Sequence, residues 1–175
     1  MQIKQAITLC QNGQTEAFRV LVEEFSPKAL RFAVHILKNK TEAEDLVQET
    51  FIQVWKSIKT LKNPDSFKSW LFTILNNLCK RKSKIVHEEE LPEENELVCP
   101  QHKSDFERID NAEMIEKYFT HLSGIKKKVL ILREMEELSY TEIANILDIP
   151  EGTVKSRIAS ARTSLRDLYL KKEGF

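Results

Sequence analysis

Residues 153 to 166 carry small, polar and basic side chains in an order that suits contact with duplex DNA. Short residues such as Ser156 and Ala159 share a helical face flanked by long cations such as Arg162. Short side chains let a helix approach base edges in the major groove, and cations reach the phosphates on either side. We expect base contacts from Lys155, Ser156, Ala159, Ser160 and Thr163, and phosphate contacts from Arg157, Arg162 and Arg166, with Thr153 also at the interface.

Two helices and a tight turn are needed to position these side chains. Ser139 and Glu142 have the spacing of a capping box, which satisfies two unpaired backbone N–H groups at a helix start. Asp148-Ile149-Pro150 interrupts this first helix, and Gly152 supplies a residue without a Cβ at the corner. The second helix has one apolar face, made of Val154, Ile158, Ala161, Leu165 and Leu168. The pattern predicts a helix-turn-helix, although an ordinary helix pair with a solvated basic face also fits it.

The composition is typical of a helical globular protein. Four glycines and five prolines in 175 residues favour helices over a turn-rich sheet, and no apolar run is long enough to span a membrane. The start of the chain is neither basic nor continuously apolar, so we expect no signal peptide. Cys10, Cys79 and Cys99 show no paired spacing, which favours the reducing cytoplasm.

Motifs for catalysis or metal binding are absent from the sequence. It contains no glycine-rich phosphate loop, no nucleophile elbow and no His/Glu set at metal-binding spacing. Cys99 and His102, with His87, offer only three candidate zinc ligands. We therefore expect no enzyme activity, no metal and no cofactor.

The formal net charge is zero, but the charges are unevenly distributed. Residues 1–82 carry 13 Lys and Arg against 8 Asp and Glu, net +5, whereas residues 83–112 carry 3 against 9, net −6. Residues 113–175 carry 11 against 10, net +1. With the helical periodicity, this distribution predicts an all-α protein: two small helical domains, 1–82 and 112–175, joined by a flexible acidic linker, 83–111.

The amino-terminal domain contains an amphipathic helix with a mixed outer face. We expect Ser26-Pro27 to break the chain between two helices, and a later helix to span Thr41–Ile58 with Thr41 and Glu44 as its capping box. The face opposite its core contains Asp45, Gln48, Glu49, Ile52 and Lys56. An apolar residue within a polar stripe is a feature of surfaces that bind a partner, although a single exposed isoleucine is common.

The helix that begins near Phe67 ends in a cluster of cations. Its expected core face is Phe67, Leu71, Ile74 and Leu78, with Asp65 or Ser66 as the cap. Phe72, Asn76 and Lys80 are expected on the opposite face, with Trp70 and Asn77 on one flank. An exposed aromatic ring, amides and cations suit single-stranded DNA, whose bases stack on rings and whose phosphates need countercharge. A core helix with a solvated basic end would show the same pattern.

One motif set in each half resembles a known family. In the carboxyl-terminal half the motifs are Leu138–Ala144, Gly152–Arg157 and Ala161-Arg162; in the amino-terminal half they are Asp45–Ile52 with Trp55, and Phe67 with Trp70–Phe72, Ile74 and Asn77. Together they are similar to the sigma-70 family of bacterial RNA polymerase sigma factors, and most similar to the small extracytoplasmic-function (ECF) group. The resemblance covers roughly residues 15–82 and 112–170, without the domain that larger sigma factors insert between these halves.

The resemblance implies a role for each motif. The segment that docks on the clamp coiled coil of core RNA polymerase corresponds to Asp45, Gln48, Glu49, Ile52, Gln53 and Lys56. The elements that read and open the downstream promoter element as single strands contain Asn63, Trp70, Phe72, Asn76, Asn77, Lys80 and Arg81. In the family, the loop that corresponds to Leu61–Ser66 captures a flipped base. The helix-turn-helix corresponds to the domain that reads the upstream promoter element as duplex DNA.

The resemblance also implies partners and marks one departure. Family members often have an anti-sigma factor, which can be membrane-anchored, whereas the chain itself is expected to stay in the cytoplasm without inserting into a membrane. After Asn77 the family usually has a small apolar and acidic run, but this chain has Leu78-Cys79-Lys80-Arg81, so the polymerase role is carried over from the family and the base preference is not. The alternative is a one-component regulator that binds duplex DNA without polymerase, which needs a dimerisation surface or an effector pocket.

Overall fold

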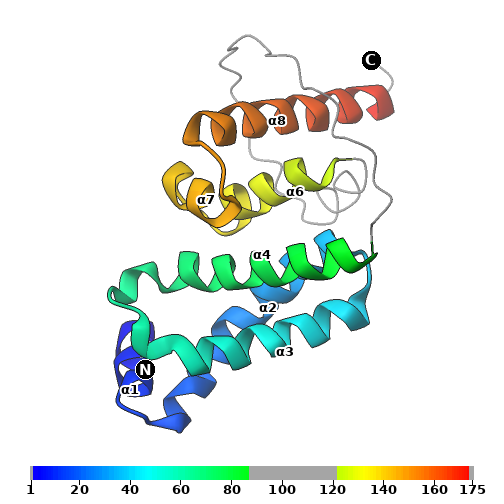
Figure 1. The fold of residues 1–175 in the computed structure, drawn as a ribbon. Helices are drawn as coiled ribbons and strands as arrows, with labels where there is room; N and C mark the ends of the chain where they lie inside the picture. Colours follow the sequence, from blue (N-terminus) through cyan, green and yellow to red (C-terminus); the bar gives the residue numbers. More distant parts are fainter. Residues whose placement is uncertain (1, 87–121, 174–175) are drawn as a thin grey trace. The chain divides into compact units, whose positions relative to one another are not determined.

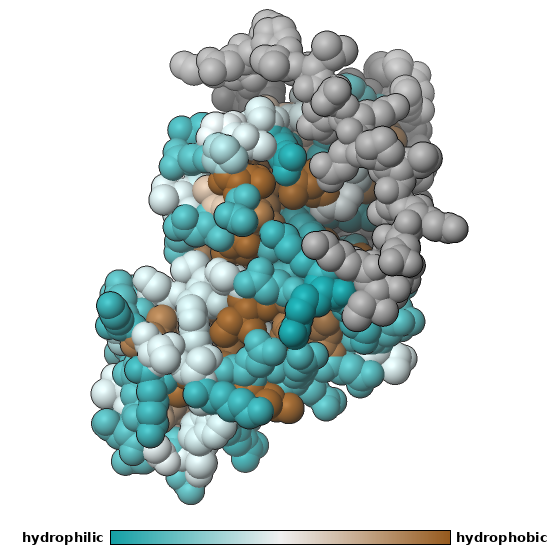
Figure 2. Space-filling view, viewed as in Figure 1, coloured by the Kyte–Doolittle hydropathy of each residue, from teal (hydrophilic) through white to brown (hydrophobic). Residues whose placement is uncertain are grey.

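The structure is a computed structural model that describes residues 2–86 and 122–173. All regular elements within these ranges are helical, which confirms the all-α prediction (Figure 1). They divide into two compact units that are described separately: α1 to α4 form the first, and α6, α8 and most of α7 belong to the second. Hydrophilic residues cover most of the visible surface, and apolar residues show there only in separate patches (Figure 2).

In its described residues, the first unit has four α-helices and three short 3-10 turns. In chain order they are α1 (Ile3–Gln11), η1 (Thr15–Ala17), α2 (Phe18–Leu37), α3 (Lys40–Ser57), η2 (Ile58–Thr60), η3 (Pro64–Ser66) and α4 (Phe67–Val86). α2, α3 and α4 pack on one another, and α1 packs on α2 and on the short turns that connect α3 to α4 (Figure 1).

Aromatic pairs join α2 to α4 within the core of the first unit. Phe25 of α2 lies 5.1 Å from Phe67 of α4, and Phe32 of α2 lies 5.6 Å from Phe72 of α4, measured between ring centroids. Edge-to-face and tilted ring pairs of this kind stabilise a core beyond the burial of their area. Phe72 is therefore a core residue, and its predicted place on the outer face of α4 is wrong.

α2 is continuous where the sequence predicted a break. It runs from Phe18 to Leu37 with Pro27 inside it, although proline removes one backbone hydrogen bond and crowds the preceding turn. Its buried face continues on both sides of Pro27, through Leu21, Phe25, Ala29, Phe32 and Ala33. Packing of this face offsets the local cost, so tertiary contacts override the proline signal.

The start of α3 differs from its predicted cap, and a further cap precedes α4. The Asn39 side chain accepts a hydrogen bond from the Glu42 N–H, so Asn39 caps α3 in place of Thr41. Asn63 caps the 3-10 turn before α4 by accepting from the Asp65 N–H at 3.0 Å. Asparagine is among the most favourable N-cap residues, because its short side-chain oxygen reaches the second or third N–H of the helix.

The second unit contains the predicted helix-turn-helix. Its elements from residue 122 onward are α6 (Gly124–Leu130), the π-helical turn η4 (Ile131–Met135), α7 (Tyr140–Leu147) and α8 (Glu151–Glu173). The Ser139 N–H donates to the Glu142 carboxylate at 2.9 Å, and the Glu142 N–H donates to the Ser139 hydroxyl at 3.2 Å. These reciprocal hydrogen bonds confirm the capping box at the start of α7.

The corner between α7 and α8 lies at the predicted interruption, Asp148-Ile149-Pro150. Asp148 has a φ of 58°, in the left-handed region that aspartate tolerates better than most residues. Gly152 lies inside α8, and a Cβ added there would meet nothing within 4 Å. The predicted need for glycine at this corner is wrong, and Asp148 provides the change of direction.

Some predictions fall on residues that the structure does not describe. Residues 83–86 of the predicted linker belong to α4. The rest of the linker and a helix expected at 106–121 lie outside the described residues, as do His87, Cys99 and His102. Among the described residues, no helix is long and apolar enough to cross a membrane. The same part of the chain contains no cluster of His, Cys, Asp or Glu suited to a metal ion.

Candidate nucleic-acid and protein interfaces

The outer face of α3 is polar with one apolar residue. Asp45, Gln48, Glu49 and Lys56 are exposed, and Gln53 is half-buried. Ile52 is 54% exposed, whereas Leu46, Val47 and Val54 of the same helix lie in the core. Exposure of this size leaves most of a large apolar side chain in water in the free protein. The predicted docking residues thus share one accessible surface.

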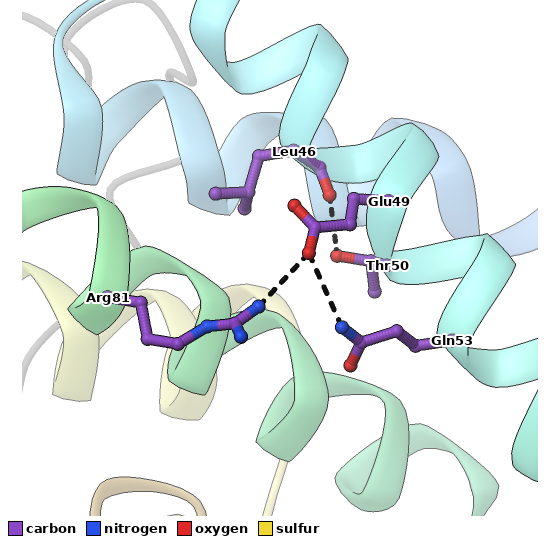
Figure 3. Close-up of polar contacts among 5 residues, drawn as sticks. All are labelled: Leu46, Glu49, Thr50, Gln53 and Arg81. Carbon is purple, nitrogen blue, oxygen red and sulfur yellow. Dashed lines mark hydrogen bonds and ion pairs between the residues drawn. The ribbon is translucent and has the colours of Figure 1, made fainter.

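Glu49 links this face of α3 to the basic end of α4. Its carboxylate lies 3.0 Å from the Arg81 guanidinium and accepts a hydrogen bond from the Gln53 amide at 3.4 Å (Figure 3). On the buried side of the helix, the Thr50 hydroxyl donates to the Leu46 carbonyl at 2.8 Å. Both partners of the Glu49–Arg81 ion pair are more than half exposed, so it is weak and readily exchanged. This ion pair joins Glu49, which is predicted to contact polymerase, to Arg81, which is predicted to contact DNA.

An apolar groove of about 560 Å³ lies alongside the α3 face. It is lined by Thr15, Phe18, Val22, Ser26, Val47, Gln48, Phe51, Ile52 and Trp55. The ring centroids of Phe18 and Trp55 lie 5.1 Å apart, and both side chains are half-buried. Ile52 and Gln48 were predicted for this surface, whereas Phe18 and Val22 of α2 were not. The available signal was the number of large apolar residues on α2, which exceeds what one buried stripe accommodates.

The predicted single-strand surface on α4 changes in the structure. Phe72 does not belong to this surface, because it is buried against Phe32. Leu75 takes the core position that was predicted for Ile74, and Ile74 itself is half-buried. Trp70 is half-buried with its ring 6.0 Å from that of Phe67. Asn76 is also fully buried, so its predicted place on the outer face is wrong. The remaining candidates on this helix are Asn77 and Arg81, which are exposed, and Lys80, which is half-buried.

The loop before α4 is held by α1. The Gln11 side-chain amide donates to the backbone carbonyls of Ile58 and Leu61, at 3.1 and 2.7 Å. At the other end of the loop, Lys4 forms an ion pair with Asp65 at 2.6 Å. Asn63, the predicted promoter contact in this loop, is exposed.

The outer face of α8 presents the predicted duplex-reading residues. Lys155, Ser156, Ala159, Thr163 and Arg166 are exposed, and Thr153, Arg157, Ser160 and Arg162 are half-buried. Val154, Ile158 and Ala161 form the buried face as predicted, whereas Leu165 and Leu168 are only half-buried. The helix therefore separates a core side from a surface that DNA can approach.

Two cations on α8 already have acidic partners. Lys155 forms an ion pair with Glu151 at 2.9 Å. Both Nε and Nη2 of Arg162 donate to Glu134 of the π-helical turn, at 3.2 and 2.5 Å. To contact DNA as predicted, the two cations must exchange these carboxylates for groups of the DNA.

Glu151 makes the stability of the second unit depend on pH. Hydrogen bonds from Lys155 and Thr141, together with the charge of Lys155, lower the pKa of Glu151 below its ordinary value of 4.5. A carboxyl with a lowered folded pKa contributes stability above its unfolded pKa, and this contribution is lost as pH falls through the folded pKa. We expect Glu151→Gln to lower the melting temperature at about pH 7 but not at about pH 3.

Thermal unfolding followed by circular dichroism measures this difference. Glu137→Gln makes the same charge change at an exposed residue outside the Glu151 cluster and serves as the control. A melting difference for Glu151→Gln that is as large at low pH as at neutral pH would contradict the assigned ionic contribution.

Family comparisons agree with both halves of the chain. The family Sigma-70 region 2 matches residues 21–84, and Sigma-70, region 4 matches residues 112–165. The chain is 30% identical to the ECF RNA polymerase sigma factor SigW of Bacillus subtilis, over 95% of this chain and 96% of the relative. It is also 30% identical to the ECF RNA polymerase sigma-E factor of Haemophilus influenzae, over 90% and 89%.

Solved structures show the same fold. The match to CnrH, solved with the cytosolic domain of CnrY, has a TM-score of 0.68 at 21% identity and covers 95% of this chain and 96% of that chain. The match to the sigma factor RpoE of Bartonella quintana, solved with the anti-sigma factor NepR, has a TM-score of 0.64 at 28% identity, over 89% and 98%. From its two matched regions and its relatives along nearly the whole chain, this protein belongs to the sigma-70 family and is an ECF-type RNA polymerase sigma factor.

Proposed function

We propose that this sigma factor binds core RNA polymerase through the outer face of α3 and brings it to promoters. The observation that carries this proposal is the exposed Ile52, which stands among polar residues beside an apolar groove. Burial of such a side chain by a partner is favourable, and the surrounding Asp45 and Glu49 can pair with cations of that partner. The clamp coiled coil of the polymerase is the proposed partner.

The proposed DNA roles fall on separate units. The loop from Leu61 to Ser66 and the exposed end of α4 bind the single-stranded downstream element, with Asn63, Trp70, Asn77 and Arg81 in contact. The outer face of α8 binds the upstream element as duplex, with Lys155, Ser156, Ala159, Ser160 and Thr163 near bases and Arg157, Arg162 and Arg166 near phosphates. The protein acts in the cytoplasm, and the polymerase carries out the nucleotide chemistry.

An anti-sigma factor is proposed as a further partner. The Bartonella relative was solved as a complex of a sigma factor with an anti-sigma factor, at 28% identity to this chain. A partner that covers Ile52 and Glu49 would exclude the polymerase from the same face. The two partners therefore compete for α3, and release of the anti-sigma factor permits transcription.

The docking surface is tested by changing Ile52. We expect Ile52→Asp to lower affinity for core polymerase by about tenfold or more, because it removes an apolar contact and adds a charge to be desolvated. Affinity is measured by biolayer interferometry with immobilised full-length protein, and folding is checked by circular dichroism. The substitution is at an exposed site, so the free protein should remain folded.

Thr41→Asp is the matched control, because it adds the same charge at an exposed position on the same helix, outside the proposed surface. Glu49→Gln is a better probe of the acidic contact than charge reversal, because an arginine there would face Arg81. Unchanged polymerase affinity for both Ile52→Asp and Glu49→Gln would exclude this face as the docking site.

A further inference from the structure

α1 makes contacts that no family match assigns to a function. The sigma region 2 match begins at residue 21, so α1, from Ile3 to Gln11, lies outside it. Gln11 donates both of its hydrogen bonds across the unit, to carbonyls 47 and 50 residues further along the chain. The side chain is half-buried and its acceptors are Ile58 and Leu61. Because these hydrogen bonds join residues so far apart in the sequence, they indicate a specific contact between α1 and the loop Leu61–Ser66.

The acceptors explain why an amide is suited to this position. The last carbonyls of a helix lack partners within it, and η2 ends at Thr60 after α3. The Ile58 carbonyl accepts from the Leu61 N–H at 3.2 Å as well as from Gln11. A glutamine amide has two N–H donors, which is the number needed to reach both carbonyls from one side chain.

The loop is held at one end, and its tip is exposed. Gln11 holds the chain at Leu61, and the exposed Lys4–Asp65 ion pair adds only a weak contact four residues later. Lys62 and Asn63 lie between these points and are exposed. Asn63 is further fixed because its side chain accepts from the Asp65 N–H and its carbonyl accepts from the Ser66 N–H, each at 3.0 Å.

We propose that Gln11 is a positioning residue for base selection in the downstream promoter element. By tying Leu61 to α1, it fixes the loop that presents Asn63 to a flipped base. This inference rests on the proposed role of the loop. A loop that is already ordered loses less entropy when the base binds, and its polar groups stay where one base edge fits better than another.

The consequence is a change in discrimination between bases. Gln11→Met keeps the length and most of the volume of the side chain but removes both donors. The backbone at Ile58 and Leu61 then loses its two hydrogen bonds to Gln11. The affinity for the correct base is expected to fall toward the affinity for an abasic site. Contacts to phosphates elsewhere on α4 do not involve Gln11, so general affinity for the template changes less than discrimination does.

The first measurement tests the positioning itself and needs no DNA. Hydrogen exchange of backbone amides in residues 58–66 is followed in the free full-length protein by mass spectrometry. Gln11→Met is expected to speed exchange there about tenfold, the effect of losing two hydrogen bonds of ordinary strength. Gln5→Met, the same change at an exposed glutamine of α1, is expected to leave the segment unchanged. Equal exchange in wild type and Gln11→Met would overturn the proposal.

The second measurement tests base selection with the full-length protein bound to core polymerase. The probes are promoter templates pre-melted across the downstream element, with each base in turn replaced by an abasic site. Wild type is expected to lose about tenfold or more in affinity at the captured base, and Gln11→Met about threefold or less. Gln11→Lys restores a donor of similar reach and is expected to recover most of the discrimination.

The outcomes separate this inference from the proposed function. If wild type shows no preference at any base, the loop does not capture a base, and both proposals are overturned. If wild type discriminates and Gln11→Met discriminates equally well, only the role of Gln11 is overturned. Faster exchange with unchanged discrimination would mean that Gln11 orders the loop without serving base selection, which also overturns the proposal.

Discussion

Replacement of Phe72 by alanine is expected to lower the free energy of unfolding of the first unit by about 3–5 kcal/mol, the usual cost of deleting a buried phenylalanine. Phe72 is fully buried, and its ring lies against that of Phe32 in α2. Alanine would remove this contact and leave a cavity that a close-packed core closes only in part. Such a loss is a large fraction of the stability of a small domain. Chemical denaturation followed by tryptophan fluorescence measures it, because both tryptophans, Trp55 and Trp70, lie in this unit.

Two substitutions on the same helix provide the comparison. Phe72→Leu keeps much of the volume and is expected to cost about 1–2 kcal/mol, while Asn77→Ala, at an exposed site, should change the stability by about 0.5 kcal/mol or less. If Phe72→Ala kept the wild-type stability and polymerase binding but failed to open promoters, the sequence-based assignment of Phe72 to DNA would be right and the core assignment wrong.

Promoter binding by the full-length protein is expected to be at least about 100-fold tighter with core polymerase than without it. The net charge is zero, so nonspecific attraction to phosphates is weak. Three cations predicted to meet DNA are already paired: Arg81 with Glu49, Lys155 with Glu151 and Arg162 with Glu134. The polymerase would hold both DNA-binding units at promoter spacing, so the second contact forms at a high effective concentration.

Mobility-shift titrations of one promoter duplex at moderate salt measure this difference. They compare the protein alone, core polymerase alone and the two together, with a shuffled duplex of the same composition as the control. Tight, sequence-specific binding by the protein alone, equal to that of the complex, would contradict dependence on polymerase and favour a one-component regulator.

Local signals predicted several features because short-range geometry determines them. The Ser139–Glu142 capping box forms because its partners are three residues apart and need no other element. The exposed face of α3 followed from helical periodicity, since every third or fourth residue shares a face. Ile52 was correctly placed on that face for the same reason.

Features set by distant contacts could not be predicted from periodicity. Two apolar stripes of α4 share Phe67, Leu71 and Leu78, and periodicity cannot choose between Ile74 and Leu75 as the fourth member. Contact with Phe32, far away in sequence, rotates the buried face toward Leu75 and Phe72. The same applies to Gln11, whose partners lie 47 and 50 residues away and carry no sequence signal, because they are backbone carbonyls.

The paired cations affect how this protein is distributed between chromosomal DNA and polymerase inside a cell. A bacterial chromosome offers millions of nonspecific binding sites, and an unpaired basic helix would spend most of its time on them. Here each of three carboxylates, Glu49, Glu134 and Glu151, competes with the chromosome for a cation. Each of these pairs is exposed and weak, so we expect it to add only modestly to the low nonspecific affinity that a net charge of zero predicts. We therefore expect a copy of the protein without polymerase to be held weakly by bulk DNA.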